Sequence, residues 1–452
     1  MSTSLHTIVL AAGKGTRMQS ATPKVLHKIA GLSMLGHVLA LAGKAGGVEM
    51  AVVIGPGMDS VRAEVARLAG SARVYVQTAQ RGTADALLAA REALAGRTGD
   101  LLVLYGDTPL LTPSTITRLR AALDAGANVA VLGFEAADPT GYGRLLTDQN
   151  GTLTAIREHK DASETERATR LCNSGVLAFR CPDVVAILDR IGNANAKAEY
   201  YLTDAIEIAR RDGLRAVAVV CPEEEVLGIN SRDQLAAAEA IYQRRARSAA
   251  MLGGATLIAP ETVWFSHDTV IGRDVTIEPN VFFGPGVTIE DDVIVHANCH
   301  FVGARLRRAA EVGPFARLRP GADIGPEVHI GNFVEIKNVT METGAKANHL
   351  AYLGDGRVGP RTNVGAGTIF CNYDGFNKHR IEIGAGAFIG SNSSLVAPLR
   401  IGDGAYIGSG SVITRDVEPD ALALERGEQR SRPGWAAKFR ALMARQRSRA
   451  AG

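Results

Sequence analysis

Residues 383–413 read IGAGAFIGSNSSLVAPLRIGDGAYIGSGSVI, in which an aliphatic residue returns at every sixth position and is usually followed by glycine. A hexapeptide period is typical of a parallel β-helix, where each short strand adds one aliphatic side chain to a stacked core. Small residues beside it allow sharp corners. The stretch therefore predicts a β-helix. Its usual form is the left-handed triangular coil, an exception to the right-handed crossover rule.

The same six-residue step occurs in two earlier runs. The members of the three runs are Ile271, Ile277, Phe283, Ile289, Val295 and Phe301; Val312, Leu318, Ile324, Ile330 and Ile336; and Ile383, Ile389, Leu395, Ile401, Ile407 and Ile413. Two segments interrupt the phase, KNVTMETGAKANHLAYLGDGR at 337–357 and CNYDGFNKHR at 371–380. Extra residues in a solenoid loop out of one face, which is often the binding face, so we expect either functional loops or tolerated surface loops.

Residues 1–230 are built in a different style, because short β-branched runs alternate with alanine- and leucine-rich amphipathic stretches. This alternation predicts an α/β, Rossmann-like domain with a mostly parallel sheet covered on both faces. Residues 231–251 are expected to form one connecting helix, capped by Ser231 or Asp233 and ended by the glycine pair that follows. The β-helix domain is then expected over 252–426, with a basic tail over 427–452.

The composition excludes several classes of protein. Hydrophobic residues make up 46% and charged residues 21%, and the net charge is +3, so nothing demands nucleic acid as a partner. The apolar stretches are shorter than the roughly 20 residues of a membrane span, and the N-terminus lacks secretory-signal features. Five scattered cysteines without a CxxC pair argue against disulfides and structural zinc. We therefore expect a cytoplasmic protein that binds neither nucleic acid nor membrane.

An apolar run leads into a glycine-rich turn near the N-terminus, in TIVLAAGKGTRMQSATPKVLHKIAG at 7–31. Gly13 and Gly15 begin a dinucleotide fingerprint, but Met18 stands where its third glycine belongs, and no P-loop string is present. The turn is expected to bring the cations Lys14, Arg17 and Lys24 together. Backbone N–H groups and cations of this kind suit a polyphosphate. The alternative is a βα turn with solvated basic residues.

Two further segments favour the polyphosphate. VLYGDTPLL places Asp107 at the carboxyl end of an apolar strand, where open α/β sheets bind ligands, and a carboxylate beside phosphates suits Mg²⁺. QTAQRGTADAL places Gln77, Gly82 and Thr83 before a helix, as a small polar set suited to a base edge.

These residues carry a family resemblance. The motifs are LAAGKGTRM, PKVLHKIAG, QRGTADAL, YGDTPLL, GYGRLL, IREHKDA and CNSGV, with NHLAYLGD, GAGTIFCNYDG and ALER in the hexapeptide part. Together they resemble the bacterial bifunctional N-acetylglucosamine-1-phosphate uridyltransferase/glucosamine-1-phosphate acetyltransferase family, from about residue 7 to 426. The first motif alone is shared by many sugar nucleotidyltransferases, and the combination is far more specific.

The resemblance implies two sets of site residues. In the uridyltransferase domain, Arg17 and Lys24 would act on the phosphates, and Asp107 and Asn230 would bind Mg²⁺. The remaining nucleotide- and sugar-binding residues would be Leu10, Ala11, Ala12, Gly13, Gln77, Gly82, Thr83, Tyr105, Gly106, Gly143, Glu158 and Asn173. In the acetyltransferase domain His349 would be the proton acceptor. Arg319, Lys337, Tyr352 and Asn363 would bind the sugar phosphate, and Ala366, Asn372, Tyr373, Ser391, Ser409 and Arg426 acetyl-CoA.

The resemblance further implies the chemistry and the assembly. Acetyl-CoA would acetylate glucosamine 1-phosphate, and UTP would then uridylylate N-acetylglucosamine 1-phosphate to UDP-N-acetylglucosamine, a cell-wall precursor, with release of pyrophosphate. Homotrimers, with acetyl-CoA between subunits, would follow from the family. The residues leave open a single-activity sugar-1-phosphate nucleotidyltransferase with a structural β-helix, and a non-enzymatic sugar-nucleotide binder. The tail would be either a solvated, partly disordered end or a basic flap over the CoA phosphates.

Overall fold

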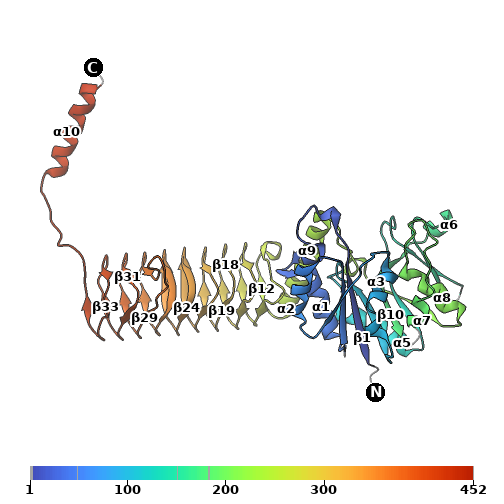
Figure 1. The fold of residues 1–452 in the computed structure, drawn as a ribbon. Coiled ribbons are helices and arrows are strands. Elements are labelled where there is room, and N and C mark those ends of the chain that lie inside the picture. The colour runs from blue at the N-terminus through green and yellow to red at the C-terminus, as the bar shows by residue number, and fades with distance from the viewer. Residues whose placement is uncertain (1–3, 48, 150, 182–183, 451–452) are drawn as a thin grey trace. The chain divides into compact units, whose positions relative to one another are not determined.

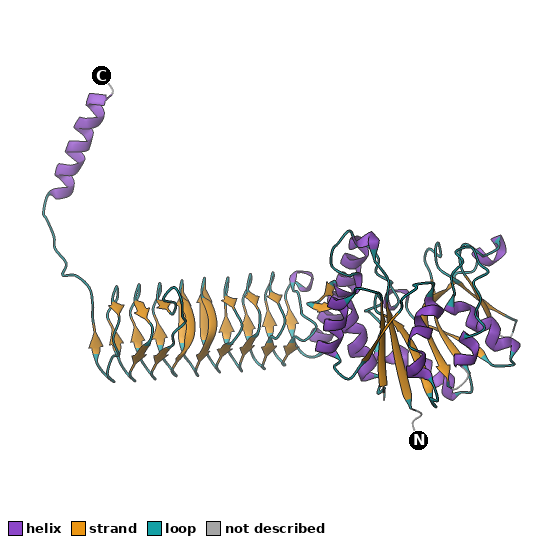
Figure 2. Cartoon of the chain, in the orientation of Figure 1, coloured by secondary structure: helices purple, strands orange, loops and turns teal. Residues whose placement is uncertain are grey.

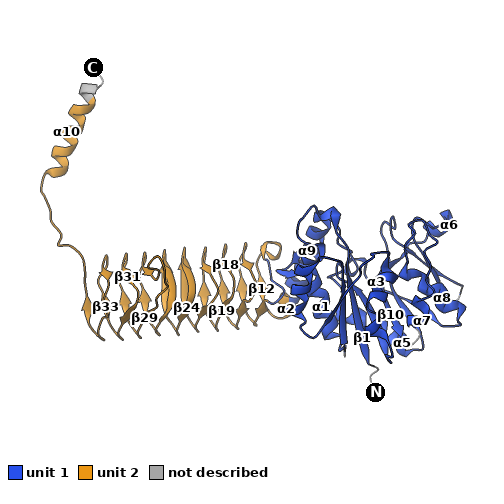
Figure 3. Ribbon diagram, viewed as in Figure 1, with its two compact units in different colours: residues 1–249, 264–268 blue, residues 250–263, 269–452 orange. Residues whose placement is uncertain are grey.

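The computed structural model describes residues 4–47, 49–149, 151–181 and 184–450. The chain divides into two compact units (Figure 3). The first comprises Met1–Ala249 with Trp264–Asp268, and the second Ala250–Val263 with Thr269–Gly452.

The first unit contains a nine-stranded sheet of order β11-β7-β10-β6-β1-β4-β5, with a β8–β9 hairpin attached to β10. Its strands are β1 Leu5–Ala11, β4 Glu49–Ile54, β5 Arg73–Val76, β6 Asp100–Tyr105, β7 Val129–Glu135, β8 Arg144–Thr147, β9 Leu153–Arg157, β10 Leu171–Arg180 and β11 Ala216–Val220. Strand β10 runs antiparallel to both of its main-path neighbours, whereas β1 is parallel to β4 and β6. The predicted mostly parallel sheet is confirmed.

Helices cover both faces of this sheet (Figure 2). They are α1 Met34–Lys44, α2 Asp59–Leu68, α3 Thr83–Ala89, α4 Arg91–Leu94, α5 Pro113–Asp124, α6 Glu164–Arg167, α7 Val184–Leu188 and α8 Ala205–Arg211, with short 3-10 turns η1 Thr16–Met18 and η2 Lys24–Leu26. Adjacent residues of β1 serve opposite faces, since Val9 belongs to the core with α1 and α5 and Ile8 to the core with α3 and α8. This two-sided burial explains why the strands are apolar throughout.

Helix α9, Arg232–Leu252, lies within one residue of the helix expected over 231–251. Its Gln243 is buried and clamps Phe265, donating to the Phe265 carbonyl at 2.7 Å and accepting from its N–H at 2.9 Å. Glu239 of the same helix accepts from the Ala30 N–H at 2.8 Å. These bonds explain why residues 264–268 belong to the first unit.

The second unit is the predicted left-handed parallel β-helix, built of successive coils of short parallel strands (Figure 1). One ten-stranded sheet has the order β12-β14-β17-β20-β23-β25-β27-β30-β33-β35, and the other strands form a fourteen-stranded sheet. The strands that position the site are β21 Arg317–Leu318, β23 His329–Asn332, β24 Glu335–Met341, β25 Lys346–His349, β26 Tyr352–Val358, β27 Asn363–Val364, β28 Ile369–Cys371, β31 Ser394–Val396, β33 Tyr406–Ile407 and β35 Leu422–Ala423. Every residue of the three hexapeptide runs is buried except Ile271, which is half-buried.

The interruption at 337–357 does not loop out, contrary to our expectation. The segment stays in the coils as parts of β24, β25 and β26, and Ile336 pairs with Leu353, one coil of 17 residues later. The phase therefore breaks because some coils are shorter than three hexads. The interruption at 371–380 does contain a protruding turn, closed by an antiparallel bridge between Tyr373 and Lys378.

The basic tail ends in a helix, α10 Trp435–Ala450, in place of the partly disordered end that was one of the two expectations. Alanine, leucine, arginine and lysine are strong helix formers, and this propensity was overlooked. Nearly all the described side chains between Glu425 and Arg447 are exposed. Among the described residues no helix combines the length and apolarity needed to cross a membrane.

Candidate active sites

The glycine-rich turn after β1 is shaped around Lys24. Gly15 has φ +62°, and a Cβ built there would lie 2.4 Å from the Lys24 Cβ, so a side chain at Gly15 would collide with the lysine. Lys24 lies in η2 and is only 8% exposed. Its aliphatic stem is therefore packed, and its ammonium is held in one place.

That ammonium lies between the two predicted metal ligands. Lys24 Nζ donates to Asp107 Oδ2 at 2.5 Å and to Asn230 Oδ1 at 2.9 Å. Asp107 follows the carboxyl end of β6, where open α/β sheets bind ligands. One carboxylate and one amide oxygen that converge on a cation fit Mg²⁺, which takes few protein ligands and leaves the rest to water and phosphate. Within the described parts of the chain, no cluster of three or more His, Cys, Asp or Glu side chains offers another metal site.

A cavity of about 510 Å³ opens beside this group. Ten residues predicted for the nucleotide line it: Leu10, Ala11, Ala12, Gly13, Lys24, Gln77, Gly82, Thr83, Tyr105 and Asp107. Gly106 does not line the cavity but packs against a residue that does, since a Cβ at Gly106 would lie 3.2 Å from the Ala11 Cβ. Arg17 is exposed in η1 and is not among the residues that line the cavity, so its predicted role lacks geometric support.

The segment 77–83, which is predicted to contact the nucleotide base, is held by hydrogen bonds at the cavity wall. Gln77 Nε2 donates to the Gly82 carbonyl at 2.9 Å and to Asp85 Oδ2 at 2.8 Å, which commits the amide NH₂ and leaves the oxygen as an acceptor. Thr83 Oγ1 accepts from the Leu202 N–H at 2.9 Å. Gly82 has φ +127° and lies against the Tyr200 backbone, where a Cβ would clash.

The cavity also contains residues absent from the predicted set. Lys14, Gln80 and Glu199 line it, and Gln80 Nε2 donates to the Ala12 carbonyl at 2.7 Å across the turn. Lys14 had been noted only as one cation of the turn. Gln80 has φ +47°, a conformation that the sequence does not reveal, so its orientation toward the turn could not be foreseen.

The three residues predicted for the sugar come together. A Cβ at Gly143 would lie 3.4 Å from Glu158 Oε1 and 3.6 Å from Asn173 Cβ, and the Asn173 N–H donates to the Gly143 carbonyl at 2.8 Å. Burial raises the pKa of the Glu158 carboxyl, while the Lys197 charge opposes the shift. Burial, together with the Asp107 and Glu158 charges, also raises the pKa of Tyr105, so its hydroxyl stays neutral.

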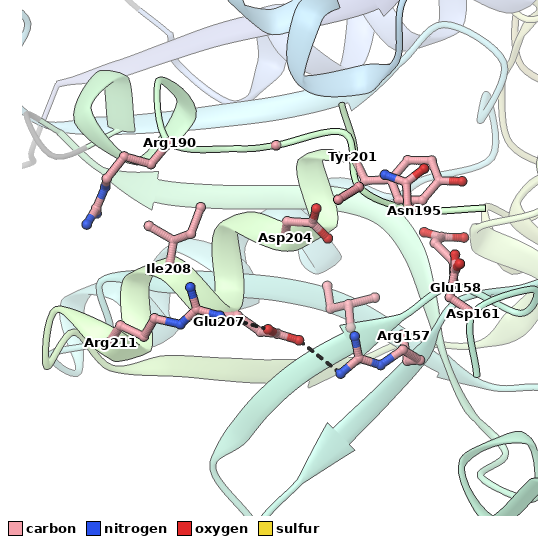
Figure 4. Close-up of a pocket in the computed structure, with 13 residues that line it drawn as sticks. Arg157, Glu158, Asp161, Arg190, Asn195, Tyr201, Asp204, Glu207, Ile208 and Arg211 are labelled. Carbon is pink, nitrogen blue, oxygen red and sulfur yellow. Dashed lines mark hydrogen bonds and ion pairs between the residues drawn. The ribbon is translucent and has the colours of Figure 1, made fainter. Parts of the chain in front are cut away.

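Glu158 also borders a second cavity of about 290 Å³ (Figure 4). Arg157 and Arg211 both pair with Glu207 in this cavity, at 3.0 and 3.5 Å. Burial raises the pKa of Asp204, which projects into the same space. Glu158 is thus one of several carboxylates around a cavity lined by charged side chains.

In the β-helix, His349 ends β25 and its side chain is exposed. Its Nδ1 lies 2.8 Å from Asn332 Oδ1, and the two residues are paired in adjacent coils. Because the amide oxygen can only accept, Nδ1 carries the proton and Nε2 is left as the basic nitrogen. Asn332 was missed by the sequence analysis, since only the 17-residue coil brings it beside His349.

The residues predicted for acetyl-CoA continue along the same edge. The backbone N–H of the residue that follows each of these positions donates to a carbonyl in the preceding coil. Gly367 donates to the His349 carbonyl, Asn392 to the Ala366 carbonyl and Gly410 to the Ser391 carbonyl. At the end of this edge, Arg426 Nη1 donates to the Ser409 carbonyl at 2.8 Å. His349, Ala366, Ser391 and Ser409 therefore occupy equivalent corners of four successive coils.

A second group gathers cations on the neighbouring face. Arg319 donates to Glu335 at 2.8 Å, and Lys337 Nζ lies 3.6 Å from Asp355 Oδ2. Lys378 of the protruding turn lies beside Lys337, and its direct interaction with Lys337, together with a smaller effect of the Arg319 charge, lowers the pKa of its ammonium. Three cations in one place suit a phosphate. Lys378 was missed because its position depends on how the turn folds back.

The remaining predicted residues lie on β26, on β27 and just after β28. Tyr352 begins β26, and its hydroxyl would lie 2.5 Å from a Cβ at Gly354. Asn363 begins β27 opposite Lys346. Asn372 is buried, whereas its neighbour Tyr373 is 60% exposed on the protruding turn.

Comparisons with known proteins cover nearly the whole chain. The model of the MobA-like NTP transferase domain matches residues 7–170, and that of the bacterial transferase hexapeptide (six repeats) matches 268–303 and 380–415. The "Bifunctional protein GlmU" of Azorhizobium caulinodans is 63% identical over 97% of this chain and 98% of its own. Proteins of the same name from Xanthobacter autotrophicus and Bradyrhizobium sp. are 60% identical over the same shares. A solved structure of UDP-glucose pyrophosphorylase complexed with UDP-glucose aligns at 19% identity with a TM-score of 0.45, over 54% of this chain and 99% of its own.

Proposed function

This chain belongs to the bifunctional GlmU family, and from that premise we propose which residues perform each of its two reactions. It is a uridyltransferase and an acetyltransferase that together make UDP-N-acetylglucosamine. Its substrates are acetyl-CoA, glucosamine 1-phosphate, N-acetylglucosamine 1-phosphate and UTP. The observation that carries the assignment is the presence of two separate constellations, one in each unit.

In uridylyl transfer, a phosphate oxygen of N-acetylglucosamine 1-phosphate attacks the α-phosphorus of UTP and pyrophosphate leaves. This chemistry depends on alignment and charge stabilisation, so no nucleophilic side chain is needed. We assign the triphosphate to Gly13 and Lys24, and the uracil edge to Gln77, whose free oxygen can accept the ring N–H. Gly143, Glu158 and Asn173 hold the sugar. Arg17 is assigned to the phosphates by the resemblance alone.

The uridylyl transfer uses a divalent metal ion, and we propose Mg²⁺. The support is the donor set, since Asp107 Oδ2 and Asn230 Oδ1 converge on one cation position. Bound there, the metal would supply neutralisation of the phosphate charge. The Lys24 ammonium, which pairs with the same two oxygens, would add its own positive charge beside the phosphates.

In acetyl transfer, the amine of glucosamine 1-phosphate attacks the thioester carbon. His349 Nε2 accepts the proton that the amine loses, the C–S bond breaks and the CoA thiolate leaves with a proton. Asn332 fixes the ring by accepting from Nδ1–H at 2.8 Å. We assign the phosphate to Arg319 and Lys337 with Lys378, the sugar to Tyr352 and Asn363, and acetyl-CoA to Ala366, Asn372, Tyr373, Ser391, Ser409 and Arg426.

We further propose the domain limits, the assembly and the compartment. Residues 1–230 are the uridyltransferase domain, 231–251 a connecting helix, 252–426 the acetyltransferase domain and 427–452 a basic tail. The family resemblance supports a homotrimer. Within the described residues none of the five cysteines is part of a disulfide, which is consistent with a reducing cytoplasm.

The two-site assignment is tested by separating the activities. Purified protein is mixed with acetyl-CoA and glucosamine 1-phosphate without UTP, and free CoA thiol is followed. Pyrophosphate release from UTP and N-acetylglucosamine 1-phosphate is measured in parallel. We expect both activities in the wild type. Absence of thiol release from folded protein would leave a single-activity nucleotidyltransferase with a structural β-helix.

A further inference from the structure

One buried carboxylate in the β-helix is not assigned to either reaction. Asp355 is 6% exposed and has φ +53°, at a corner of its coil. Asn338 occupies the preceding corner, with φ +50°, and Asn372 follows in the next coil. Burying an unpaired charge is costly, so a carboxylate here must be compensated by its surroundings.

The compensation comes from the two amides. Asn338 Nδ2 donates to Asp355 Oδ1 at 2.8 Å, and Asn372 Nδ2 donates to Asp355 Oδ2 at 2.5 Å. The three side chains thus form an amide–carboxylate–amide ladder through successive coils. Burial alone would raise the pKa of Asp355, but these hydrogen bonds and the Lys337 charge lower it, so the group is ionised.

The ladder leads directly to the proposed ligand groups. Lys337 Nζ lies 3.6 Å from Asp355 Oδ2, and its side chain is mostly buried. Asn372, held by the same oxygen, is assigned to acetyl-CoA, and Lys337 to the sugar phosphate. A single carboxylate oxygen therefore contacts one residue from each half of the acetyl-transfer site.

We propose that Asp355 is a positioning residue of the acetyltransferase site, which fixes Lys337 and Asn372 relative to each other before either substrate binds. The inference rests on the proposed acetyl transfer. Arg319, Lys337 and Lys378 would otherwise repel one another in the empty site, and Lys337 would have no fixed partner. A cation held in place loses less conformational freedom when phosphate arrives.

The test replaces Asp355→Asn, which keeps the shape and removes the charge. We expect the KM for glucosamine 1-phosphate to rise about tenfold, the factor that one charge-assisted hydrogen bond is worth. Pyrophosphate release by the first unit should be unchanged. Asp323→Asn is the matched control, because Asp323 also accepts two hydrogen bonds, from Arg307, on the same β-helix. We expect that control to stay within twofold of the wild type.

A double-mutant cycle separates positioning from a structural role. Lys337→Met alone should raise the same KM, and adding Asp355→Asn should make it less than about twofold worse, because Asp355 acts through Lys337. Effects that multiply would overturn the proposal, as would a normal KM in Asp355→Asn. If Asp355→Asn does not fold, Asn338→Ala loosens the same carboxylate, and an unchanged KM there would equally overturn it. Wild-type protein without acetyl transfer would instead refute the proposed function.

Discussion

In the first unit, the Lys24 ammonium meets Asp107 and Asn230, which lie 83 and 206 positions away along the chain. In the second, His349 meets Asn332 only 17 positions away, and Asp355 meets Asn338 and Asn372 at the same interval. The first site requires the complete α/β fold, whereas the second requires only that neighbouring coils keep their register. The same chain thus builds one site by long-range packing and another by repetition.

Removing the proposed base, His349, should produce the largest effect, and only the activity of the second unit should be lost. We expect His349→Ala to lower the rate of acetyl transfer about 10³-fold, since general-base catalysis contributes 10²–10⁴-fold. Uridylyl transfer should not change, because the first unit holds its own site. Thiol release and pyrophosphate release are measured on the same preparation. His329→Ala is the control, and an equal loss in it would remove His349 from its role.

The corresponding change in the first unit is Asp107→Asn. We expect uridylyl transfer to fall about 10²-fold, because the amide binds the divalent metal less well than the carboxylate does. Chelating the divalent metal with EDTA should stop the same reaction and leave acetyl transfer intact. Pyrophosphate release is followed over a range of Mg²⁺ concentrations. Asp124→Asn, on the surface of the same unit, should behave as the wild type, and a metal-independent Asp107→Asn enzyme with full activity would contradict the assignment.

A smaller effect tests the sugar side through Glu158→Gln. The KM for N-acetylglucosamine 1-phosphate should rise about tenfold, for a lost charged hydrogen bond. The folding stability of the variant should instead exceed that of the wild type at high pH. Burial raises the folded-state pKa of Glu158, so its folded state binds the proton more readily and stability is lost as pH rises through that pKa. At pH 8 the variant should therefore melt about 1–3 °C higher than the wild type.

Melting is followed by circular dichroism between pH 5 and 8, and initial rates give the KM. Glu164→Gln on the exposed helix α6 is the control. A Glu158→Gln variant that melts lower at pH 8 and keeps a normal KM would place this carboxylate in a structural role.

The smallest expected effect concerns the stability of the β-helix and the His296 side chain, which bonds carboxylates of the neighbouring coils. Burial alone would lower the pKa of His296, but its hydrogen bonds to Glu311 and Glu278, at 2.9 and 3.0 Å, raise it. This stabilisation is complete below the unfolded pKa of about 6.5 and is lost as pH rises through the folded value. We expect His296→Gln to lower the melting temperature of the β-helix by about 1–2 °C at pH 5.5 and less at pH 8. An equal drop in melting temperature at both pH values would mean that His296 stabilises the β-helix by packing and not by its charge.

The repeat explains why the fold of the second unit was readable from sequence. Each hexad residue has the same buried environment, so periodicity alone located the core, and only the first residue, Ile271, is half-buried. The phase break at 337–357 was misread as a loop because a coil one residue shorter looks like an insertion. Residues held by coil register or turn geometry, such as Asn332 and Lys378, left no signal of their own.

In the first unit, the features that could be predicted from sequence were those set by local sequence. Its strand edges and glycine turn were recognisable because local sequence sets them, and Asp107 could be placed at the end of β6. Gln80 could not, since its left-handed backbone turns it toward Ala12. Arg17 shows the converse limit, because a motif position does not guarantee that a side chain lines the cavity.

The corner positions His349, Ala366, Ser391 and Ser409 give the β-helix a further property. Neighbouring strands of a sheet lie roughly 4.8 Å apart, so three coil steps from His349 to Ser409 span roughly 14 Å. The distance between the proposed base, His349, and the proposed acetyl-CoA residue Ser409 is therefore set in whole coils. A substitution within a coil changes the side chain at one corner. Only the gain or loss of a whole coil changes the distance between the His349 and Ser409 corners.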